Sequence, residues 1–188
     1  MISFPTRLHE IYQRIKSINP EKYRYTRNYI DGAVTYLSPY ISRGVISTKT
    51  VYNHLIEENY PFETIEKYVQ ELAWRDYWQQ IWVHKKDAIN TDLKSQQQNV
   101  ENHEIPKAIL TKSTGIKSID KAIHSLEDIG YMHNHMRMYV ASIATNIAKS
   151  HWKQPAKWMY YHLLDGDWAS NALSWQWVAG SNSNKKYY

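Results

Sequence analysis

Apolar residues recur along most of this chain at the three- and four-residue intervals of helices that bury one face. The first such helix is marked by Leu8, Ile11, Ile15 and Ile18. No stretch shows a convincing two-residue alternation of apolar and polar positions, the pattern of a half-buried strand. The sequence therefore predicts an all-α fold.

Pro and Ser residues mark the beginnings of several predicted helices. Pro20 is expected to open a short second helix, because its fixed φ suits the first helical turn. Ser47 is a candidate N-cap for a helix over 48–58. Pro61 stands where a long helix that runs to His84 is expected to begin.

Loops and the remaining helices follow from Gly residues and from polar stretches. Residues 32–39 are predicted to form a loop, and the polar stretch 90–104 is predicted to form a surface loop. A helix over 117–129 is expected to end at Gly130, a favourable residue after a helix C-terminus. Further helices are expected near 132–149, near 155–164 and from about Gly166.

Composition narrows the classes of function. The 188 residues suffice for about one domain with a substantial core. The absence of cysteine excludes disulfides and cysteine-ligated metal centres. No signal peptide and no apolar run of about 20 residues is evident, so we expect a cytoplasmic protein without a membrane partner. A net charge of +5 fits a polyanionic partner such as nucleic acid, or simply solvated lysines, and 8 Trp and 16 Tyr suit stacking sites or an aromatic core.

Two segments in the first half carry candidate chemistry. The stretch 35–40 places small hydroxyls ahead of a helix, where they could hold phosphate oxygens or serve only as a turn and a cap. On the long predicted helix, a single face combines an acid, a guanidinium and two indoles. Its members are Glu71, Trp74, Arg75 and Trp78. The alternative is an amphipathic helix with a Glu71–Arg75 surface pair.

Two more segments lie in the second half. Asn134, Arg137 and Met138 share one face of a predicted helix, whereas His133 and His135 are two residues apart and point to different sides. Shared metal ligation by these histidines is therefore not expected. Further along, two acids at a helix start are either caps or ligands of a divalent cation, and an amide and an indole share a face after them. These residues are Asp165, Asp167, Asn171 and Trp175.

Taken together and in this order, the segments resemble the FAD-binding catalytic domain of the DNA photolyase/cryptochrome family. The most specific matches are Glu-Leu-Ala-Trp-Arg (71–75), Tyr-Met-His-Asn-His-Met-Arg-Met (131–138), Leu-Asp-Gly-Asp-Trp-Ala-Ser-Asn (164–171) and Trp-Gln-Trp (175–177). The resemblance runs from about Phe4 to Trp177. It implies one all-α FAD-binding domain over 1–188 that lacks the N-terminal α/β antenna domain and is shortened at its C-terminus. A separate partner chain is then a candidate for the antenna role.

The resemblance implies FAD as the cofactor and no metal. Contacts to the cofactor's phosphates and ribityl chain would come from Tyr23, Val34, Thr35, Leu37 and Ser38, with Val34 where the family often has a hydroxyl. Arg75 would lie close to the flavin. Around the isoalloxazine, the resemblance implies an Arg137–Asp165 ion pair, a hydrogen bond between Asp167 and the ring, and an amide of Asn171 that faces N5. Asn134 also lies among these residues.

The resemblance also implies a DNA partner that contains ultraviolet lesions. The positions that would receive a flipped-out cyclobutane pyrimidine dimer are Glu71, Trp74, Asn134, Met138 and Trp177, and Asn171 joins them as a catalytic residue. Relatives that repair the 6-4 photoproduct carry histidines at Asn134 and Met138, which favours the cyclobutane substrate. His135 stands where an arginine is common.

For electron transfer, the resemblance implies a relay through Trp175 and Trp152. The third relay position falls near Asn99, in a polar region without Trp, so another donor such as Trp158 or a tyrosine is an alternative. The leading hypothesis is light-dependent DNA repair by electron transfer from FAD. A cryptochrome-like blue-light photoreceptor and a flavin-free scaffold that binds nucleic acid or protein remain as alternatives.

Overall fold

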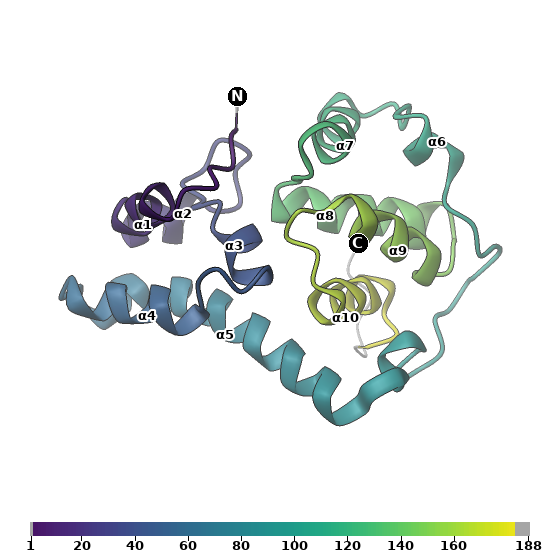
Figure 1. The fold of residues 1–188 in the computed structure, drawn as a ribbon. Coiled ribbons are helices and arrows are strands. Elements are labelled where there is room, and N and C mark those ends of the chain that lie inside the picture. Colours follow the sequence, from purple (N-terminus) through teal and green to yellow (C-terminus); the bar gives the residue numbers. More distant parts are fainter. Residues whose placement is uncertain (1, 183–188) are drawn as a thin grey trace. The chain divides into compact units, whose positions relative to one another are not determined.

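A computed structural model describes residues 2–182, and within this range the chain forms helices and loops without a strand (Figure 1). An isolated bridge pairs Asn102 with Ser150. The all-α prediction is confirmed. The helices are α1 (Leu8–Lys16), α2 (Pro20–Thr26), α3 (Ser38–Ser42), α4 (Thr48–Glu57), α5 (Phe62–Lys85), η1 (Lys86–Asn90), α6 (Lys107–Leu110), α7 (Lys117–Ile129), α8 (Asn134–Ser142), η2 (Ile143–Ile147), α9 (Lys153–His162) and α10 (Trp168–Ala179).

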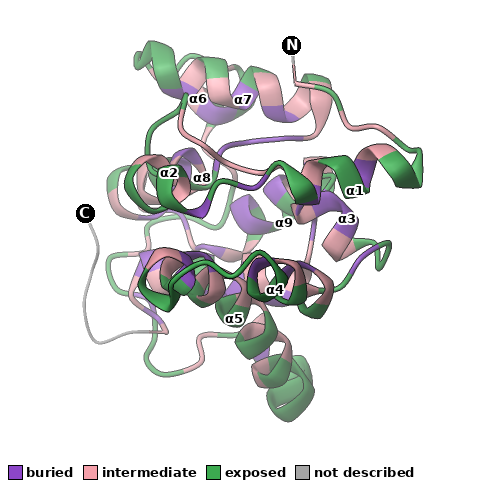
Figure 2. Cartoon of the chain, turned by 90° about the vertical axis from the view of Figure 1, so that its left-hand side faces the viewer, coloured by how far each residue is buried: buried purple, intermediate pink, exposed green. Residues whose placement is uncertain are grey.

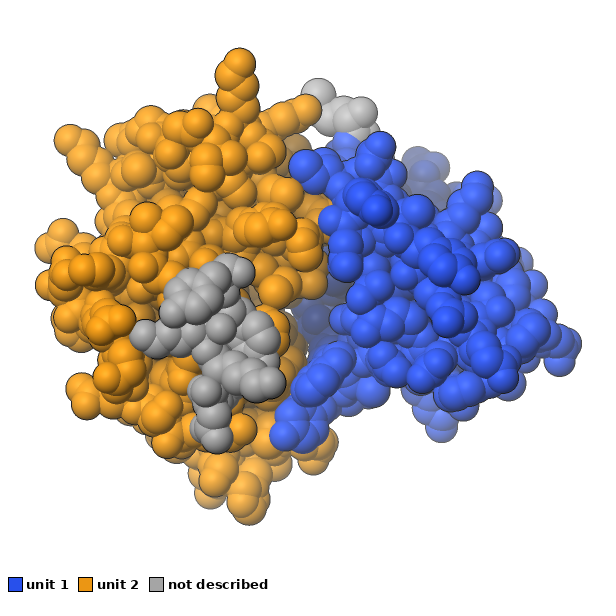
Figure 3. All heavy atoms as spheres, turned by 180° about the vertical axis from the view of Figure 1, so that it is seen from behind, with its two compact units in different colours: residues 1–77 blue, residues 78–188 orange. Residues whose placement is uncertain are grey.

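The chain divides into two compact units (Figure 3). The boundary between them falls within α5. Unit 1 comprises residues 1–77 and unit 2 comprises residues 78–188. The assignment of 1–188 to one FAD-binding domain stays a prediction. Its first residue and its end at 183–188 lie outside the described part of the chain.

Unit 1 is built on the apolar faces that the sequence pattern indicates. Its core comprises Ile11, Ile15, Ile18, Leu37, Tyr40, Ile46, Val51, Leu55, Ile65 and Tyr68. Leu8 is exposed, and α1 ends at Lys16, before Ile18. Buried and exposed stretches alternate along the helices, as amphipathic packing requires (Figure 2).

The predicted starts of two helices in unit 1 are confirmed, and the predicted loop before α3 is shorter than expected. Pro20 begins α2, and Ser47 caps α4 by accepting a hydrogen bond from the backbone N–H of Thr50 at 3.0 Å. The expected loop over 32–39 is shorter than predicted, because α3 already begins at Ser38 and has a proline in its first turn.

Unit 2 packs α7 to α10 around a second core. This core contains Ile109, Ile119, Ile123, Leu126, Met132, Met136, Val140, Ala141, Ala144, Trp152, Ala156, Met159, Leu163, Ala172, Trp175, Val178 and Ala179. Gly130 ends α7 with a φ of 68°, as predicted. The next helix begins at Asn134 rather than near 132, because His133 Nδ1 caps it by accepting from the His135 N–H at 3.2 Å.

The segment 90–104 is free of α-helix, as predicted, but it is not entirely a surface loop. Gln97 is only 5% exposed. Its side chain donates to Ser150 O at 3.0 Å and accepts from the Trp152 N–H at 2.9 Å. A buried amide is stable here because both of its ends bond backbone groups of another segment. None of the helices in residues 2–182 combines the length and apolar content that a bilayer-spanning helix needs.

Candidate functional site

A small pocket in unit 1 lies between the segment around Thr35 and the middle of α5. Its volume is about 170 Å³, and it is lined by Tyr23, Thr35, Leu37, Ser38, Ile41, Tyr68, Glu71, Leu72 and Arg75. The structure thus brings together five of the six residues of unit 1 that the sequence predicts to bind the cofactor. Val34, the sixth, is not among the lining residues.

The polar groups of this pocket are neutral hydroxyls, the guanidinium of Arg75 and the carboxylate of Glu71. Thr35 Oγ1 and the Tyr68 hydroxyl are 2.9 Å apart, and burial raises the pKa of Tyr68 to about 12, so this hydroxyl keeps its proton. Arg75 Nη2 donates to Ser42 Oγ at 2.7 Å. Hydroxyl donors beside a fixed guanidinium suit an anionic oxygen such as that of a phosphate.

Glu71 and Trp74 stand one turn apart on α5. Glu71 Oε1 lies 3.6 Å from Arg27 Nε and 3.3 Å from Lys67 Nζ. The alternative hypothesis paired Glu71 with Arg75. The ion pairs that we observe join Glu71 to Arg27 and Lys67 instead. Trp74 is 50% exposed, and its ring meets that of Tyr77 edge to face. A held carboxylate therefore stands beside an indole whose ring is open to solvent.

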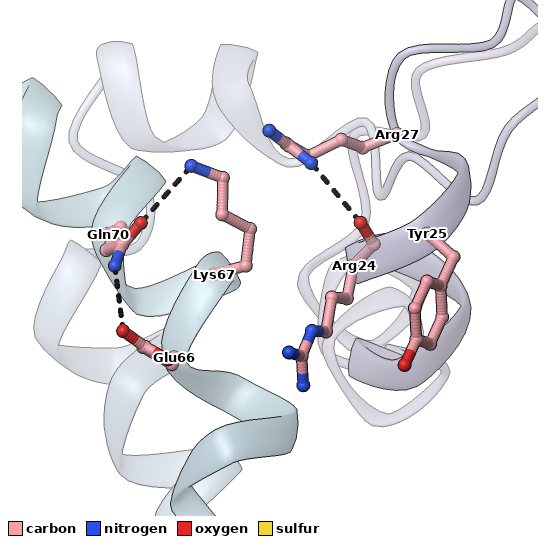
Figure 4. A pocket seen from close by; sticks show the side chains of 6 residues that line it. All are labelled: Arg24, Tyr25, Arg27, Glu66, Lys67 and Gln70. Atoms are coloured by element: carbon pink, nitrogen blue, oxygen red, sulfur yellow. Dashed lines mark hydrogen bonds between the residues drawn. The ribbon is translucent and has the colours of Figure 1, made fainter.

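A second and larger hollow of unit 1, of about 330 Å³, has a positive lining (Figure 4). Its lining residues are Arg24, Tyr25, Arg27, Glu66, Lys67 and Gln70. Three cations face one carboxylate there, which favours an anionic ligand. This hollow was not predicted from the sequence. Its cations lie at the end of α2 and on α5, about 40 residues apart, and only the overall positive charge indicated them.

In unit 2, the predicted ion pair of Arg137 and Asp165 is confirmed. Arg137 Nη2 donates to both carboxylate oxygens of Asp165, at 3.0 and 2.9 Å, and Arg137 Nε donates to Met132 O at 2.8 Å. Asp165 is buried, with a side chain only 5% exposed, while that of Arg137 is 21% exposed. The guanidinium is thus fixed in direction by three hydrogen bonds.

Asp167 is the N-cap of α10, and Asn171 lies in the first turn of that helix. Asp167 Oδ1 caps this helix by accepting from the Ser170 N–H at 3.0 Å, and its Oδ2 accepts from Gln79 Nε2. Asn171 Nδ2 donates to Ala156 O at 2.8 Å. Both side chains are held in place by α9, α10 and the C-terminal part of α5, and their predicted contacts with the flavin stay a prediction.

The remaining predicted residues of unit 2 occupy α8 and α10. Asn134 begins α8 and is exposed, and Met138 follows one turn later and is partly buried. Trp177 is partly buried against the core of unit 2. His133 acts as a helix cap, and no group of three potential metal-binding side chains occurs in residues 2–182.

The two predicted relay tryptophans are both buried in the core of unit 2. Trp152 is 0% exposed and Trp175 is 2% exposed. Trp152 Nε1 donates to Asp92 Oδ1 at 2.7 Å. Trp158, the alternative donor, packs partly buried against the same core and meets His162 edge to face.

The polar groups of each unit fit part of FAD in their chemistry. The pocket of unit 1 offers hydroxyls and a guanidinium for a phosphate, and the Arg137–Asp165 pair of unit 2 offers a fixed positive charge for a flavin that becomes anionic on reduction. The 170 Å³ pocket is smaller than the roughly 300 Å³ at which ligand sites begin, so by itself it suits only a portion of the dinucleotide.

Comparison with known proteins agrees with this chemistry. Residues 68–188 match the family model of the FAD binding domain of DNA photolyase. The chain is 30% identical over 98% of its length to the deoxyribodipyrimidine photo-lyase of Neurospora crassa, and 31% identical over 82% of its length to that of Streptomyces griseus. It covers 32% and 34% of these proteins, so it spans about a third of their length.

Solved structures share the fold. A cryptochrome from Synechocystis superposes with a TM-score of 0.88 over all of this chain and 41% of its own, at 21% identity. A class III photolyase from Agrobacterium tumefaciens superposes with a TM-score of 0.77 over 92% of this chain and 37% of its own, at 27% identity.

Proposed function

Because the chain belongs to the DNA photolyase/cryptochrome family and carries the FAD-binding domain of that family, we propose that it serves light-dependent repair of cyclobutane pyrimidine dimers in DNA. The observation that carries the proposal is the half-exposed indole of Trp74 beside the held carboxylate of Glu71. Relatives that are named deoxyribodipyrimidine photo-lyase support the same assignment.

On this proposal Trp74 receives the lesion. A dimerised base pair is already poorly stacked, so extruding it from the duplex costs less than extruding a normal base. An exposed indole then recovers part of that cost by stacking, about 1–3 kcal/mol per base. Glu71 accepts hydrogen bonds from base N–H groups, and Arg27 and Lys67 keep its carboxylate in position.

In unit 2, Asn134 and Met138 are assigned to the lesion as well. The exposed amide of Asn134 offers a donor and an acceptor to a base edge, and the Met138 thioether offers a soft apolar contact. Trp177 contributes a further indole. These residues bind the dimer without a proton transfer of their own.

The cofactor assignments follow the polar residues of the unit 1 pocket and those around the Arg137–Asp165 pair of unit 2. When bound and reduced, FAD would supply the light-driven electron donation by which the cyclobutane ring is split. Tyr23, Thr35, Leu37, Ser38 and Arg75 are assigned to its phosphates and ribityl chain. Arg137 is the fixed cation that stabilises negative charge on the flavin, Asp165 orients it, and Asp167 and Asn171 are assigned to hydrogen bonds with the ring.

The positive hollow of unit 1 is assigned to the DNA backbone. Arg24, Arg27 and Lys67 supply three cations at one place, and cations that neutralise phosphates give affinity that falls as salt rises. The excess charge of +5 on the whole chain acts in the same direction.

The proposal is tested in two steps with the purified chain. Titration with FAD is followed by its visible absorption, and a dimer-containing oligonucleotide is then assayed with reduced FAD in blue light and in the dark. We expect light-dependent repair. FAD binding without repair would favour a blue-light photoreceptor, and DNA binding without FAD binding would favour a flavin-free scaffold.

A matched pair of variants tests the role of Trp74. Trp74→Ala removes the stacking ring and is expected to weaken binding of dimer-containing DNA by about tenfold or more. Trp82→Ala removes an indole of similar exposure from the same helix, where no lesion contact is assigned. Equal losses in both variants would contradict the assignment of Trp74.

A further inference from the structure

Trp152 has an unusual partner for a buried indole. The ring is 0% exposed within the core of unit 2, yet its Nε1 donates to a carboxylate oxygen, Asp92 Oδ1, at 2.7 Å. A neutral acceptor satisfies an indole N–H equally well, as the amide of Asn90 does for Trp168 at 2.9 Å. A carboxylate is costly at a site with a side chain only 15% exposed, so a structural role alone does not require it.

The carboxylate and the indole are held by one set of hydrogen bonds. Asp92 Oδ2 accepts from the Gln97 N–H at 2.9 Å, and the Gln97 side chain in turn bonds Ser150 O and the Trp152 N–H. The neighbouring Leu93 N–H donates to Gln176 Oε1 at 3.1 Å. Asp92 is therefore fixed against Trp152 rather than brought there by a mobile loop.

The titratable group next to Asp92, His151, is neutral and therefore does not cancel the negative charge beside the indole. His151 Nε2 lies 3.6 Å from Asp92 Oδ1, and His151 Nδ1 accepts from the Lys153 N–H at 3.3 Å, so a neutral His151 carries its proton on Nε2. Burial lowers the pKa of His151, although Asp92 opposes this shift, and the ring is neutral at pH 7. His103 stacks on His151, with ring centroids 5.1 Å apart.

We propose that Asp92 accepts the Nε1 proton of Trp152 when this indole loses one electron. The electron passes to a one-electron oxidant, which is reduced. The Nε1–H bond breaks, its electron pair stays on the ring nitrogen, and the proton forms an O–H bond with Asp92 Oδ1. The products are a neutral indolyl radical and a protonated carboxyl, and the net charge of the pair rises by one.

The physical reason is the sign of the charge that oxidation creates. An oxidised indole is a cation, and its N–H becomes a much stronger acid than that of the neutral ring. A carboxylate already in hydrogen-bond contact stabilises this cation and lies in line to take the proton. Only the biological use of the step rests on the proposed function, together with the electron relay through Trp175 and Trp152 that the family resemblance implies.

The test needs neither FAD nor DNA, so it stands apart from the repair assay. The natural sequence contains no cysteine, and Gln154, two residues after Trp152, is exposed. Gln154→Cys therefore gives a single thiol for a ruthenium polypyridyl photo-oxidant. Flash excitation with a soluble electron acceptor generates the oxidant, and transient visible absorption distinguishes an indole cation radical from a neutral radical. The same flash on a Trp152→Phe background defines the part of the signal that comes from Trp152.

We expect the Trp152 signal to be the neutral radical, formed more slowly in D₂O than in H₂O. In Asp92→Asn, which retains a hydrogen-bond acceptor but no charge, we expect the cation radical and an oxidation equilibrium about tenfold less favourable. Asp87→Asn removes the same charge from an exposed residue five positions earlier in the chain and is expected to match the parent. No Trp152-dependent signal, equal signals with Asp92 and its Asn variant, or the absence of an isotope effect in the parent would each overturn the proposal. The isotope effect decides it even when Asp92→Asn does not fold.

Discussion

Replacing Arg137 by Met tests whether the ion pair with Asp165 stabilises unit 2 as a buried interaction. Met retains most of the apolar stem of arginine and removes the guanidinium. The change deletes both bonds to the Asp165 carboxylate and the bond from Nε to Met132 O. Asp165 is only 5% exposed, so the change removes the Arg137 cation from a carboxylate that water reaches poorly.

The expected loss in free energy of unfolding follows from how far each side chain of the pair is buried. Removing one partner of a fully buried pair costs about 3–5 kcal/mol, because a charge is left without compensation. The Arg137 side chain is 21% exposed, so water recovers some of this loss and we expect roughly 2–4 kcal/mol. Asp165→Asn leaves one oxygen as an acceptor for the guanidinium, and water can still reach the guanidinium. This change is therefore expected to cost less, about 1–2 kcal/mol.

Urea unfolding followed by circular dichroism measures these free energies by linear extrapolation. The matched control is Lys149→Met, which breaks the exposed pair of Lys149 with Glu101, whose side chains are 45% and 65% exposed. That variant is expected to change stability by about 0.5 kcal/mol or less. The reasoning is refuted if Arg137→Met costs no more than Lys149→Met, or if Asp165→Asn costs more than Arg137→Met.

Three further predictions concern helix ends and pH. Ser47→Ala removes the cap of α4 and is expected to lower the free energy of unfolding by about 1 kcal/mol in the same urea assay; no change would mean that the cap is not needed. Gly130→Ala is expected to cost roughly 1–3 kcal/mol, because φ is 68° and the new Cβ would lie 2.5 Å from Leu164 Cγ, and a loss below that of Ser47→Ala would contradict this. The pKa of His151 is lowered from 6.5 in the folded protein, so the unfolded chain takes up this proton first as pH falls. Stability is therefore expected to fall as pH drops below about 6.5. Urea titrations at several pH values should show this slope, and His151→Gln should reduce it.

The helices were predictable because their signals are local. Apolar spacing, the proline at position 20 and the serine at position 47 each act within one or two turns, and the structure confirms them. The boundaries that differ by a few residues do so for equally local reasons. His133 caps α8 from a position that the apolar pattern alone reads as helix.

The residues of the candidate site could be predicted where they belong to the family motifs, and not where they lie outside these motifs. The family motifs placed Arg137 and Asp165 together although 28 residues separate them, and they placed Thr35 with Arg75 at one pocket. Arg27 was not predicted as a partner of Glu71, because nothing in the sequence around it shows that the C-terminal end of α2 lies against α5. Lys67 pairs with Glu71 at the i,i+4 spacing within α5, a local signal that the sequence contains but that the prediction did not use. Ion pairs between distant helices depend on packing, and no periodicity encodes that packing.

Gln97, which is buried, and Asp92, which is partly buried, show where the polar composition of the segment 90–104 misleads. Gln and Asp in a polar stretch usually lie at the surface, because burying them without partners is costly. Here the partners are backbone groups at 150–152 and the indole of Trp152, all about 50 to 60 residues away. The same bonds that make burial tolerable also fix a carboxylate on an oxidisable ring. A polar stretch that a sequence pattern assigns to solvent can therefore hold the charge that controls the chemistry of a core residue.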